Sequence, residues 1–359
     1  MRTIVLTGGG SAGHVTLNLA LLAPLARAGL SPVYIGSVAG IERALVERAG
    51  VPYHAIKVGK LRRYRSVQNL IDPLRVAAGV AQASALLRRL APAAVFSKGG
   101  FVAVPVAAAA WLNRIPLVVH ESDLTPGLAN RLCFPLATRI CAAQPETAAA
   151  IGRADRVVHT GTPIRPDVLA AERAEGQRRF GLDPTLGTLL VIGGSLGAEA
   201  INRVLRETLD RLPGDLQVVH VCGAGNRSSA HEGRPRYQQH EYIDQGYGHL
   251  LAAADLVVSR AGANSLAELL ALRRPALLIP LPLSASRGDQ IDNARKHAQL
   301  GFGHVLDEAE LTPERLIHEL ERLRSEAQAM TTRMASEGGA DPAETLVTLL
   351  EQVARGATR

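Results

Sequence analysis

Short, uninterrupted apolar runs recur along the chain, and longer segments with the apolar spacing of helices separate them. The runs are rich in Val, Ile and Leu, which is typical of strands that are buried on both faces of a parallel sheet. We predict strands at 3–7, 31–36, 94–97, 115–120, 156–160, 188–192, 217–221, 256–259 and 276–280. Regular alternation of strands and helices predicts α/β domains with a doubly wound sheet.

The pattern that opens the chain occurs a second time. A strand, a glycine turn and a helix start follow one another at 3–14 and again at 188–202. We therefore predict two Rossmann-like domains, at 1–163 and 164–340, with the proline-containing segment 161–167 as the linker. Segment 341–359 is predicted to be a terminal helix, with Asp341 as its N-cap and Pro342 at its first position.

Length and composition indicate a soluble globular protein. The chain has 359 residues, more than one hydrophobic core usually serves; 47% of them are hydrophobic and 20% are charged. No 18-residue uncharged apolar run occurs and the N-terminus does not resemble a signal peptide, so we expect a cytoplasmic protein. Cys133, Cys141 and Cys222 show no metal-site spacing and are expected to be reduced, buried thiols.

Charge is distributed unevenly between the two halves. Residues 1–165 contain 19 Lys and Arg against 7 Asp and Glu, a net charge of +12, while the whole chain carries +7. This asymmetry predicts an anionic partner for the first half: a phosphorylated substrate, an anionic lipid surface or nucleic acid. Nucleic acid is disfavoured because only 3% of the residues are aromatic and no recognised nucleic-acid-binding motif occurs.

A stretch that combines basic and apolar residues lies at 60–89. It resembles a surface that docks on a membrane, although an ordinary surface helix with one core-facing stripe fits the pattern nearly as well. The residues assigned to this membrane patch are Lys60, Arg62, Arg63, Arg65, Leu70 and Leu74.

The first glycine loop can bind phosphate and ends in a titratable group. Gly8, Gly10 and Gly13 match the G-x-G-x-x-G fingerprint of dinucleotide-binding proteins. That fingerprint also requires an acid at the end of the second strand, whereas this strand ends in Gly36 and Ser37, which disfavours an NAD-dependent enzyme. His14 stands at the start of a helix, where the helix dipole favours a neutral imidazole; it is either a general base or a cap of the loop.

Two further strand ends in the first half carry polar residues. Lys98 follows one strand in a glycine turn, where it either meets a phosphate or is solvated. His120, Glu121 and Asp123 follow the next strand, at the edge of the sheet where α/β proteins bind ligands. Asp123 is the better candidate for a substrate contact, since structural roles for His120 and Glu121 are equally compatible with the sequence.

The second half contains two turns that lead into helices, at 193–197 and 259–268. Backbone amides and hydroxyls such as those of Ser195 and Ser265 can hold a diphosphate. Glu268 is placed to accept hydrogen bonds from two ribose hydroxyls, or alternatively to interact with the helix dipole. No Asp-x-Asp motif occurs, so we expect a reaction that needs neither a metal nor another cofactor.

Together and in this order, the motifs resemble the MurG family of UDP-N-acetylglucosamine transferases. The resemblance covers nearly the whole chain and is carried by the segments at 7–14, 97–105, 120–130, 161–165, 193–198, 259–268 and 286–294. It implies an α/β protein of the GT-B fold, two Rossmann-like domains whose parallel sheets face each other across a cleft. The implied reaction is the inverting, metal-independent transfer of GlcNAc from UDP-GlcNAc to the MurNAc 4-hydroxyl of lipid I, which forms lipid II of peptidoglycan. The implied location is peripheral, on the cytoplasmic face of the cell membrane, with an anionic membrane surface as a further partner.

The resemblance also implies roles for individual residues. Catalysis is assigned to His14 and Asp123. Donor binding is assigned to Ser11, Gly13, Arg165, Gly194, Ser195, Arg260, Ala263, Asn264, Ser265, Glu268, Asp289 and Gln290. Acceptor binding is assigned to Gly10, Ser11, Lys98, Gly99, Gly100, His120 and Glu121.

Three motifs depart from the commoner family pattern, one of them being the segment 286–290, which leads to Gln290. Ser11 and Ala12 replace Thr and Gly in the first loop, and Asp123 replaces an amide, so that His14 and Asp123 are both candidates for the general base. Two other functions share features with this one: a UDP-GlcNAc 2-epimerase, and a membrane-associated nucleotide-sugar binder without catalytic activity. The epimerase would not need the basic first half.

Overall fold

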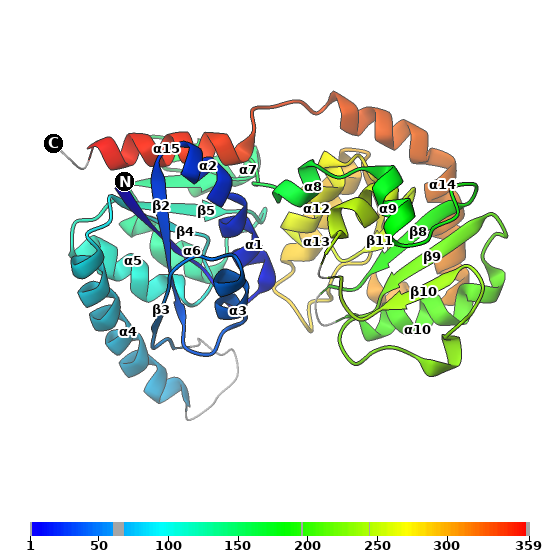
Figure 1. Cartoon of the computed structure of the whole chain (residues 1–359), viewed down its shortest axis with the longest axis horizontal. Coiled ribbons are helices and arrows are strands. Elements are labelled where there is room, and N and C mark those ends of the chain that lie inside the picture. The colour runs from blue at the N-terminus through cyan, green and yellow to red at the C-terminus, as the bar shows by residue number, and fades with distance from the viewer. Residues whose placement is uncertain (1, 60–67, 195–196, 244, 357–359) are drawn as a thin grey trace. The chain divides into compact units, whose positions relative to one another are not determined.

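The computed structural model of the chain describes residues 2–59, 68–194, 197–243 and 245–356. The chain divides into two compact units, of which unit 1 comprises Met1–Arg165 with Ala340–Arg359 and unit 2 comprises Pro166–Gly339. Each unit is built around one parallel sheet (Figure 1).

The sheet of unit 1 has seven strands in the order β3-β2-β1-β4-β5-β6-β7. Chain order reverses between β1 and β4, which makes their carboxyl ends the place where such sheets bind ligands. The strands are β1 Arg2–Thr7, β2 Leu30–Ser37, β3 Tyr53–Ile56, β4 Ala94–Ser97, β5 Leu117–Glu121, β6 Arg139–Ala142 and β7 Val157–His159. The helices are α1 Ala12–Ala20, α2 Leu22–Arg27, α3 Ile41–Arg48, α4 Gln68–Leu90, α5 Ala103–Leu112, α6 Leu128–Cys133, α7 Pro145–Ile151 and α15 Pro342–Gly356.

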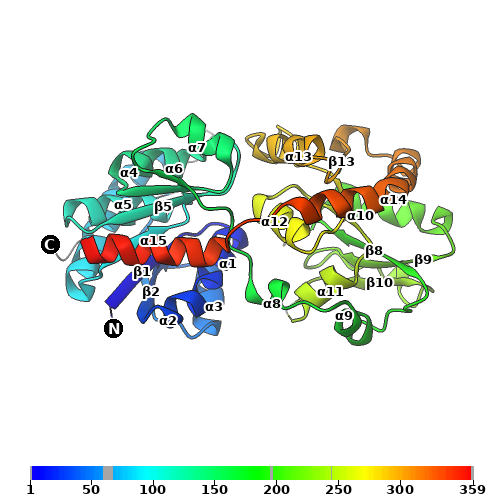
Figure 2. The same cartoon turned by 90° about the horizontal axis from the view of Figure 1, so that it is seen from above.

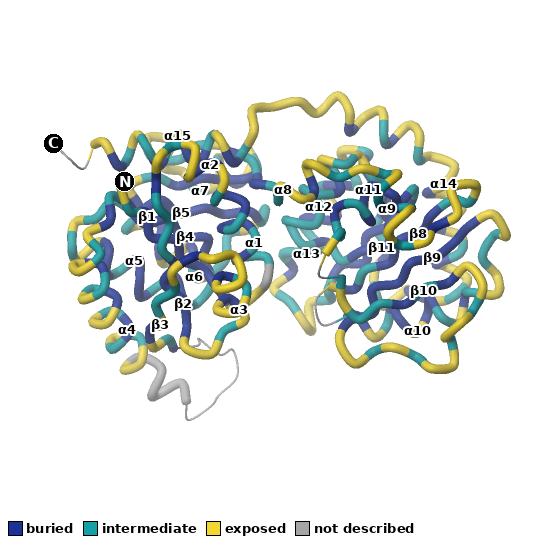
Figure 3. Tube along the Cα trace, viewed as in Figure 1, coloured by how far each residue is buried: buried dark blue, intermediate teal, exposed yellow. Residues whose placement is uncertain are grey.

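Both faces of this sheet are buried. Along β1, Ile4 and Leu6 pack into one cluster with residues of α1, α2 and α15, while Val5 packs into another with residues of α4, α5 and α6. Successive side chains of a strand point to opposite faces, so each face needs its own layer of helices. The strands are accordingly buried along most of their length (Figure 3).

The sheet of unit 2 has six strands in the order β10-β9-β8-β11-β12-β13, and its chain order reverses between β8 and β11. The strands are β8 Gly187–Ile192, β9 Leu216–Val221, β10 Tyr237–His240, β11 Leu256–Ser259, β12 Ala276–Leu278 and β13 Gly303–Val305. The helices are α8 Pro166–Leu169, α9 Arg173–Arg179, α10 Glu199–Thr208, α11 Tyr247–Ala253, α12 Ala263–Ala271, α13 Asp289–Gln299 and α14 Pro313–Ser336.

Every strand predicted from the apolar runs is present, and the two-sheet α/β prediction is confirmed. The prediction missed β3, β6, β10 and β13. Three of these are edge strands of their sheets, and β3 and β10 contain polar residues because an edge strand is only partly covered. Their sequences therefore lack the uninterrupted apolar run on which the prediction relied.

The terminal helix α15 packs on unit 1, where Leu346, Val347 and Leu350 are buried in the same cluster as β1 (Figure 2). The carboxylate of Asp341 accepts a hydrogen bond from the backbone amide of Ala343 at 2.8 Å, so Asp341 caps the helix.

None of the helices in the described parts of the chain is both long enough and apolar enough to cross a bilayer.

Candidate functional site

Three loops of unit 1 follow adjacent strands. The glycine loop at 8–11 follows β1, the turn at 98–100 follows β4, and the loop at 122–127 follows β5; β4 pairs with both β1 and β5. Parallel strands end at the same edge of a sheet, so the first two loops meet at the reversal of chain order and the third lies beside them. The structure thus brings His14, Lys98 and Asp123 to one edge of one sheet.

His14 is held by the backbone of its own loop. Its Nδ1 donates a hydrogen bond of 2.8 Å to the carbonyl oxygen of Gly9. This bond fixes the tautomer in which Nδ1 carries the proton and Nε2 carries the lone pair. An ideal Cβ built on Gly100 would lie 3.0 Å from His14 Nδ1 and 2.1 Å from the Gly9 oxygen, so the two glycine loops are in close contact at the imidazole.

Lys98 is buried although it is a lysine, with 3% of its surface exposed. Burial lowers the pKa of its ammonium group, and the nearby negative charges of Glu121 and Asp123 oppose that shift. Its Cβ lies against Gly8, where an added Cβ would approach it to 3.2 Å. The side chain therefore places a positive charge beside the first glycine loop and the loop that follows β5.

His120 is fully buried on β5. Its Nε2 donates a hydrogen bond of 2.9 Å to the carbonyl oxygen of Gly161, and no hydrogen bond to Nδ1 is present among the described residues. Burial, with a further contribution from the Lys98 ammonium, lowers the pKa of His120 to about 3. The imidazole is thus neutral near pH 7, and it links the end of β5 to the segment that leaves unit 1.

Glu121 organises the loop that carries Asp123. Its carboxylate accepts hydrogen bonds from the backbone amides of Asp123 and Gly127, at 3.0 and 2.9 Å, and from Asn130 Nδ2 at 2.9 Å. With 3% of its surface exposed, Glu121 has little access to a substrate, whereas Asp123 is half-buried at the rim.

The remaining predicted residues of unit 1 lie in the same loops. Gly10 adopts φ +87°, and an added Cβ would lie 2.7 Å from the ring of Phe101. Gly99 adopts φ +95°, and an added Cβ would lie 2.5 Å from Asn130 Oδ1. Ser11 is the N-cap residue of α1, and Gly13 lies in its first turn. The glycines are needed for these backbone conformations and close contacts.

In unit 2, Gln290 connects two loops at the sheet edge. Its Oε1 accepts hydrogen bonds from the backbone amides of Ala261 and Leu281, at 3.3 and 3.2 Å. Ala261 follows β11 and Leu281 follows β12, and these strands are paired. Gln290 therefore connects the loops that follow β11 and β12 through its Oε1, and its Nε2 group remains a hydrogen-bond donor.

Arg260 is tied into the framework of unit 2. Its guanidinium donates to the carbonyl oxygens of Ile279 and Pro280 and forms an ion pair with Glu308. Only 11% of its side chain is exposed. These contacts fix the loop after β11 rather than extend toward solvent.

Helix α12 begins directly at this edge. Its N-cap residue is Gly262, which supplies no side-chain cap, and α13 likewise begins after Gly288 with Asp289 as its first residue. Ser265 and Glu268 are three residues apart on α12 and so share a face. Ala263, Asn264, Ser265 and Glu268 are all half-buried.

The other five predicted donor residues belong to other segments of the chain. Ser195 lies outside the described residues. Gly194, the residue before it, adopts φ +91° with no atom within 4 Å of an added Cβ. Arg165 ends the first segment of unit 1, to which Ser11 and Gly13 also belong.

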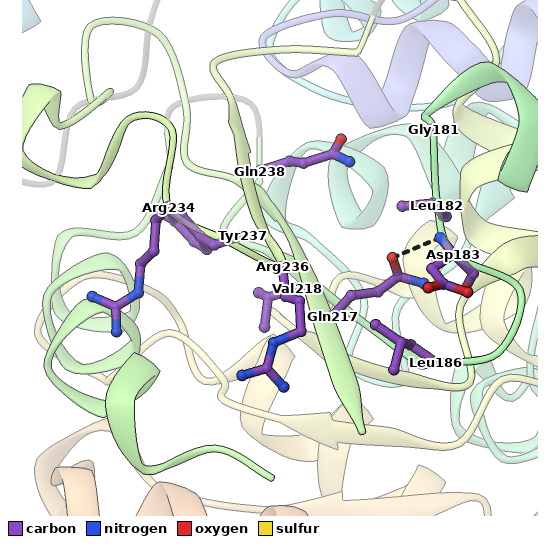
Figure 4. Close-up of a pocket in the computed structure, with 10 residues that line it drawn as sticks. All are labelled: Gly181, Leu182, Asp183, Leu186, Gln217, Val218, Arg234, Arg236, Tyr237 and Gln238. Atoms are coloured by element: carbon purple, nitrogen blue, oxygen red, sulfur yellow. Dashed lines mark hydrogen bonds between the residues drawn. The ribbon is translucent and has the colours of Figure 1, made fainter. Parts of the chain in front are cut away.

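A pocket of about 350 Å³ in unit 2 lies elsewhere, at the amino ends of β9 and β10 (Figure 4). Its polar side chains are engaged within the unit: Gln217 exchanges hydrogen bonds with the backbone of Asp183, and Arg234 pairs with Asp210. None of the residues predicted for the site lines this pocket, and we assign it no ligand.

Glu42 and Trp111 were not predicted from the sequence. Glu42 is fully buried below the first glycine loop, and Trp111 has 59% of its surface exposed at the end of α5. Glu42 follows the end of β2 by five residues. It was missed because the acid of a dinucleotide-binding site was expected at the end of the strand itself. Trp111 is the only tryptophan of the chain, and no motif in the sequence pointed to it.

Comparison with protein-family models gives two matches. Residues 4–142 match the N-terminal domain of glycosyltransferase family 28, and residues 188–347 match the C-terminal domain of the same family.

Among curated proteins, a UDP-N-acetylglucosamine–N-acetylmuramyl-(pentapeptide) pyrophosphoryl-undecaprenol N-acetylglucosamine transferase of Geobacillus kaustophilus is 46% identical over 99% of both chains. A protein of the same name from Lachnoclostridium phytofermentans is also 46% identical, over 98% of this chain and 99% of its own.

Among solved structures, MurG of Acinetobacter baumannii has a TM-score of 0.76 at 23% identity and covers 98% of this chain and 100% of its own. The UDP-GlcNAc 2-epimerase of Neisseria meningitidis, bound to UDP-GlcNAc, has a TM-score of 0.70 at 13% identity over 98% of this chain and 100% of its own. At these identities the two structures show a shared fold.

Proposed function

The chain belongs to glycosyltransferase family 28, and from this membership we propose that it transfers GlcNAc from UDP-GlcNAc to the MurNAc 4-hydroxyl of lipid I, which yields lipid II. The observation that carries the proposal is the 46% identity, over almost the full length of both chains, to relatives that are named for this reaction.

We propose that unit 2 binds the donor. The N-termini of α12 and α13, which no side chain caps, and residues 193–194 after β8 supply backbone N–H groups for the diphosphate of UDP-GlcNAc. Glu268 accepts hydrogen bonds from the ribose hydroxyls, and the Nε2 group of Gln290 donates to the sugar. As UDP leaves, the same N–H groups stabilise the negative charge that develops on the diphosphate.

The acceptor pyrophosphate, in this proposal, binds the glycine loops of unit 1 beside Lys98. His14 is our candidate for the general base. Its Nδ1 donates to the Gly9 oxygen, which leaves the lone pair on Nε2 to accept the proton of the MurNAc hydroxyl. Attack of the resulting oxygen on the anomeric carbon expels UDP and inverts the configuration.

Asp123 is the weaker candidate for the base. Its carboxylate lies near the Lys98 ammonium and stabilises that positive charge, whereas His14 has a tautomer fixed by the Gly9 carbonyl oxygen. We assign Asp123 the role of orienting the acceptor hydroxyl by hydrogen bonding.

The experiment that tests the transfer is to incubate the protein with UDP-GlcNAc and a lipid I analogue, with and without chelator, and to measure UDP release. We expect release that requires the acceptor, is unaffected by chelator, and gives a β-linked disaccharide. Release of UDP without acceptor would indicate epimerase chemistry, and no release would indicate a binder without activity.

Two variants assign the base. His14→Ala is expected to lower kcat roughly 10²–10⁴-fold, the usual contribution of a general base. Asp123→Asn keeps the shape and hydrogen bonding of the side chain and is expected to lose much less. The opposite ranking of the two variants would transfer the role of base to Asp123.

We further propose that unit 1 docks peripherally on the cytoplasmic face of the cell membrane. Leu74 on α4 is 72% exposed, Trp111 and Leu112 at the end of α5 are 59% and 58% exposed, and the two helices pack together. Lys60, Arg62, Arg63 and Arg65 lie outside the described residues, as does the side chain of Leu70. Apolar side chains that insert between lipids, together with basic residues that attract anionic headgroups, are the two components of such binding.

A further inference from the structure

Glu42 is a buried carboxylate with no place in the mechanism above. It lies in the first turn of α3, and none of its surface is exposed. Its Oε1 accepts hydrogen bonds from the backbone amide of Ser37, at 3.0 Å, and from the Ser37 hydroxyl. Among the described residues no hydrogen bond reaches Oε2.

Glu42 is hydrogen-bonded to Ser37, the last residue of β2, and so lies near the place where dinucleotide-binding sheets carry an acid at the end of the second strand. Here the carboxylate turns inward. With no exposed surface it offers no atom to a ribose hydroxyl, so a ligand-binding role is excluded and the group must act on the protein around it.

Two glycines make room for this carboxylate. An ideal Cβ on Gly40 would lie 2.1 Å from both carboxylate oxygens, and one on Gly9 would lie 2.9 Å from Cδ and Oε1. Neither glycine has a positive φ, so conformational freedom does not explain them. Both positions are glycine because a Cβ atom there would collide with the carboxylate of Glu42.

Gly9 connects Glu42 to the proposed base. An added Cβ on Gly9 would also lie 2.9 Å from Val102, so Glu42 and Val102 together fill the space next to Gly9 that a side chain would occupy. The carbonyl of the same residue accepts the Nδ1 hydrogen of His14. The orientation of the imidazole therefore depends on the position of a peptide that Glu42 contacts directly.

The other titratable groups around Glu42 are neutral or directed elsewhere. Burial raises the pKa of Tyr34 on β2 and of Tyr53 on β3, and the charge of Glu42 raises both further. Arg43 on α3 pairs with Glu47 at the surface. Lys98 is a buried cation whose Cβ lies against Gly8 rather than Gly9.

We propose that Glu42 is a positioning residue for His14: it fixes the Gly9 peptide to which the imidazole is bonded, and its negative charge stabilises the protonated imidazole that forms during transfer. The inference rests on the proposed function only for the identity of the reaction in which His14 becomes protonated. A packing role alone could be filled by an apolar side chain without the cost of burying a carboxylate.

The test uses Glu42→Gln, which keeps the size of the side chain and an oxygen for Ser37 but removes the charge. A nearby negative charge raises the pKa of an imidazole, so its removal lowers that pKa. We expect the acid limb of the pH–rate profile to move down by about half a pH unit or more and kcat to fall roughly three- to tenfold. The KM for UDP-GlcNAc should stay within about twofold of the wild-type value, since the donor is assigned to unit 2.

Glu47→Gln is the matched control, because Glu47 lies on the same helix with 51% of its side chain exposed. It should change neither the acid limb nor kcat. An NMR titration of His14, assigned through His14→Gln, measures the same pKa shift without any turnover. A wild-type protein that releases no UDP would therefore contradict the proposed function and leave the Glu42 inference open to this test.

An acid limb and a His14 titration that both stay unchanged in Glu42→Gln would overturn the inference, even if the variant were less stable. Should Glu42→Gln fail to fold, Ser37→Ala provides a test of opposite sign. It removes a donor from Oε1, leaves the carboxylate charge less compensated and is expected to raise the pKa of His14. A lowered or unchanged His14 pKa in Ser37→Ala would contradict the proposal.

Discussion

At the scale of single residues, burial separates the roles of the charged groups in unit 1. His120 and Glu121 are committed to backbone groups of their own unit, whereas Lys98 is buried near two carboxylates, with no ion pair within 4 Å among the described residues. A buried ammonium with so little compensation destabilises the fold. An ammonium group beside a glycine loop can bind an anionic acceptor. We therefore interpret Lys98 as a functional residue rather than a structural one.

Lys98→Met tests this interpretation. We expect the KM for the lipid I analogue to rise about tenfold or more, the effect of losing one charge-assisted hydrogen bond, while the Tm stays equal or increases. The folded-state pKa of Lys98 lies below its unfolded value, so the stability gain should be largest at neutral pH and shrink as pH rises through the titration of the lysine. Lys57→Met, at an exposed position, is the control.

A lower Tm in Lys98→Met with an unchanged KM would show that Lys98 is a structural residue. Steady-state kinetics and thermal unfolding between pH 7 and about 10.5, the ordinary lysine range, distinguish the two results.

At the scale of elements, the site of unit 1 depends on the contact between two strand-to-helix turns. Gly100 adopts φ +80° in the turn between β4 and α5, and it packs on the Gly9 carbonyl in the turn between β1 and α1. Since that carbonyl also binds His14, any side chain at position 100 displaces the acceptor of the imidazole. A change in either turn is therefore expected to displace the other.

Gly100→Ala is expected to lower kcat roughly 10²-fold, because the reacting group loses its orientation. Gly152→Ala is the matched control: Gly152 adopts φ +69°, but no atom lies within 4 Å of an added Cβ. Both variants place an alanine in the left-handed backbone region, which costs about 1–2 kcal/mol. Only Gly100→Ala also brings the new Cβ into collision with the Gly9 carbonyl oxygen. Equal kcat values for the two variants, measured with saturating UDP-GlcNAc, would contradict this account.

At the scale of the whole molecule, charge and apolar surface are concentrated in unit 1. The net charge of +12 in residues 1–165 and the exposed apolar side chains of α4 and α5 belong to the same unit. Unit 1 is completed by α15, which returns from the end of the chain to cover one face of its sheet. The unit assigned to the lipid-linked acceptor thus also carries the surface proposed for lipid contact.

Replacement of Leu74 and Trp111 by serine tests this surface. Each large apolar side chain that enters the bilayer contributes about 1.5–3 kcal/mol, so each substitution is expected to weaken binding to anionic vesicles about tenfold or more. Transfer to a water-soluble acceptor analogue should be unchanged.

Because Trp111 is the only tryptophan, a blue shift of its fluorescence on vesicle addition reports insertion directly in the wild-type protein. Leu300→Ser, at an exposed position of unit 2, is the control. Unchanged vesicle binding in the Leu74 and Trp111 variants would place the membrane contact elsewhere.

The sequence by itself determined the α/β architecture and the chemistry-bearing loops. Strands buried on both faces must be apolar throughout, so β1, β4 and β5 were visible as runs, and the polar residues that follow them were visible as loop ends. The edge strands β3 and β10 were missed because partial exposure allows polar residues in them, and β13 was missed because its three residues, Gly303–Val305, do not form an apolar run.

Only the tertiary structure decided which of the predicted polar residues are engaged within their own unit. It showed Arg260 tied to Glu308 and two carbonyl oxygens, and Gln290 bridging two loops. It also revealed Glu42, whose contact with Gly9 crosses 33 positions of the chain. Periodicity and motifs report which residues lie near one another along a strand or helix, whereas burial and hydrogen bonding between distant segments depend on how the elements pack. For that reason the sequence identified the glycine loop that carries His14, whereas only the fold showed that Glu42 and Gly100 pack against that loop.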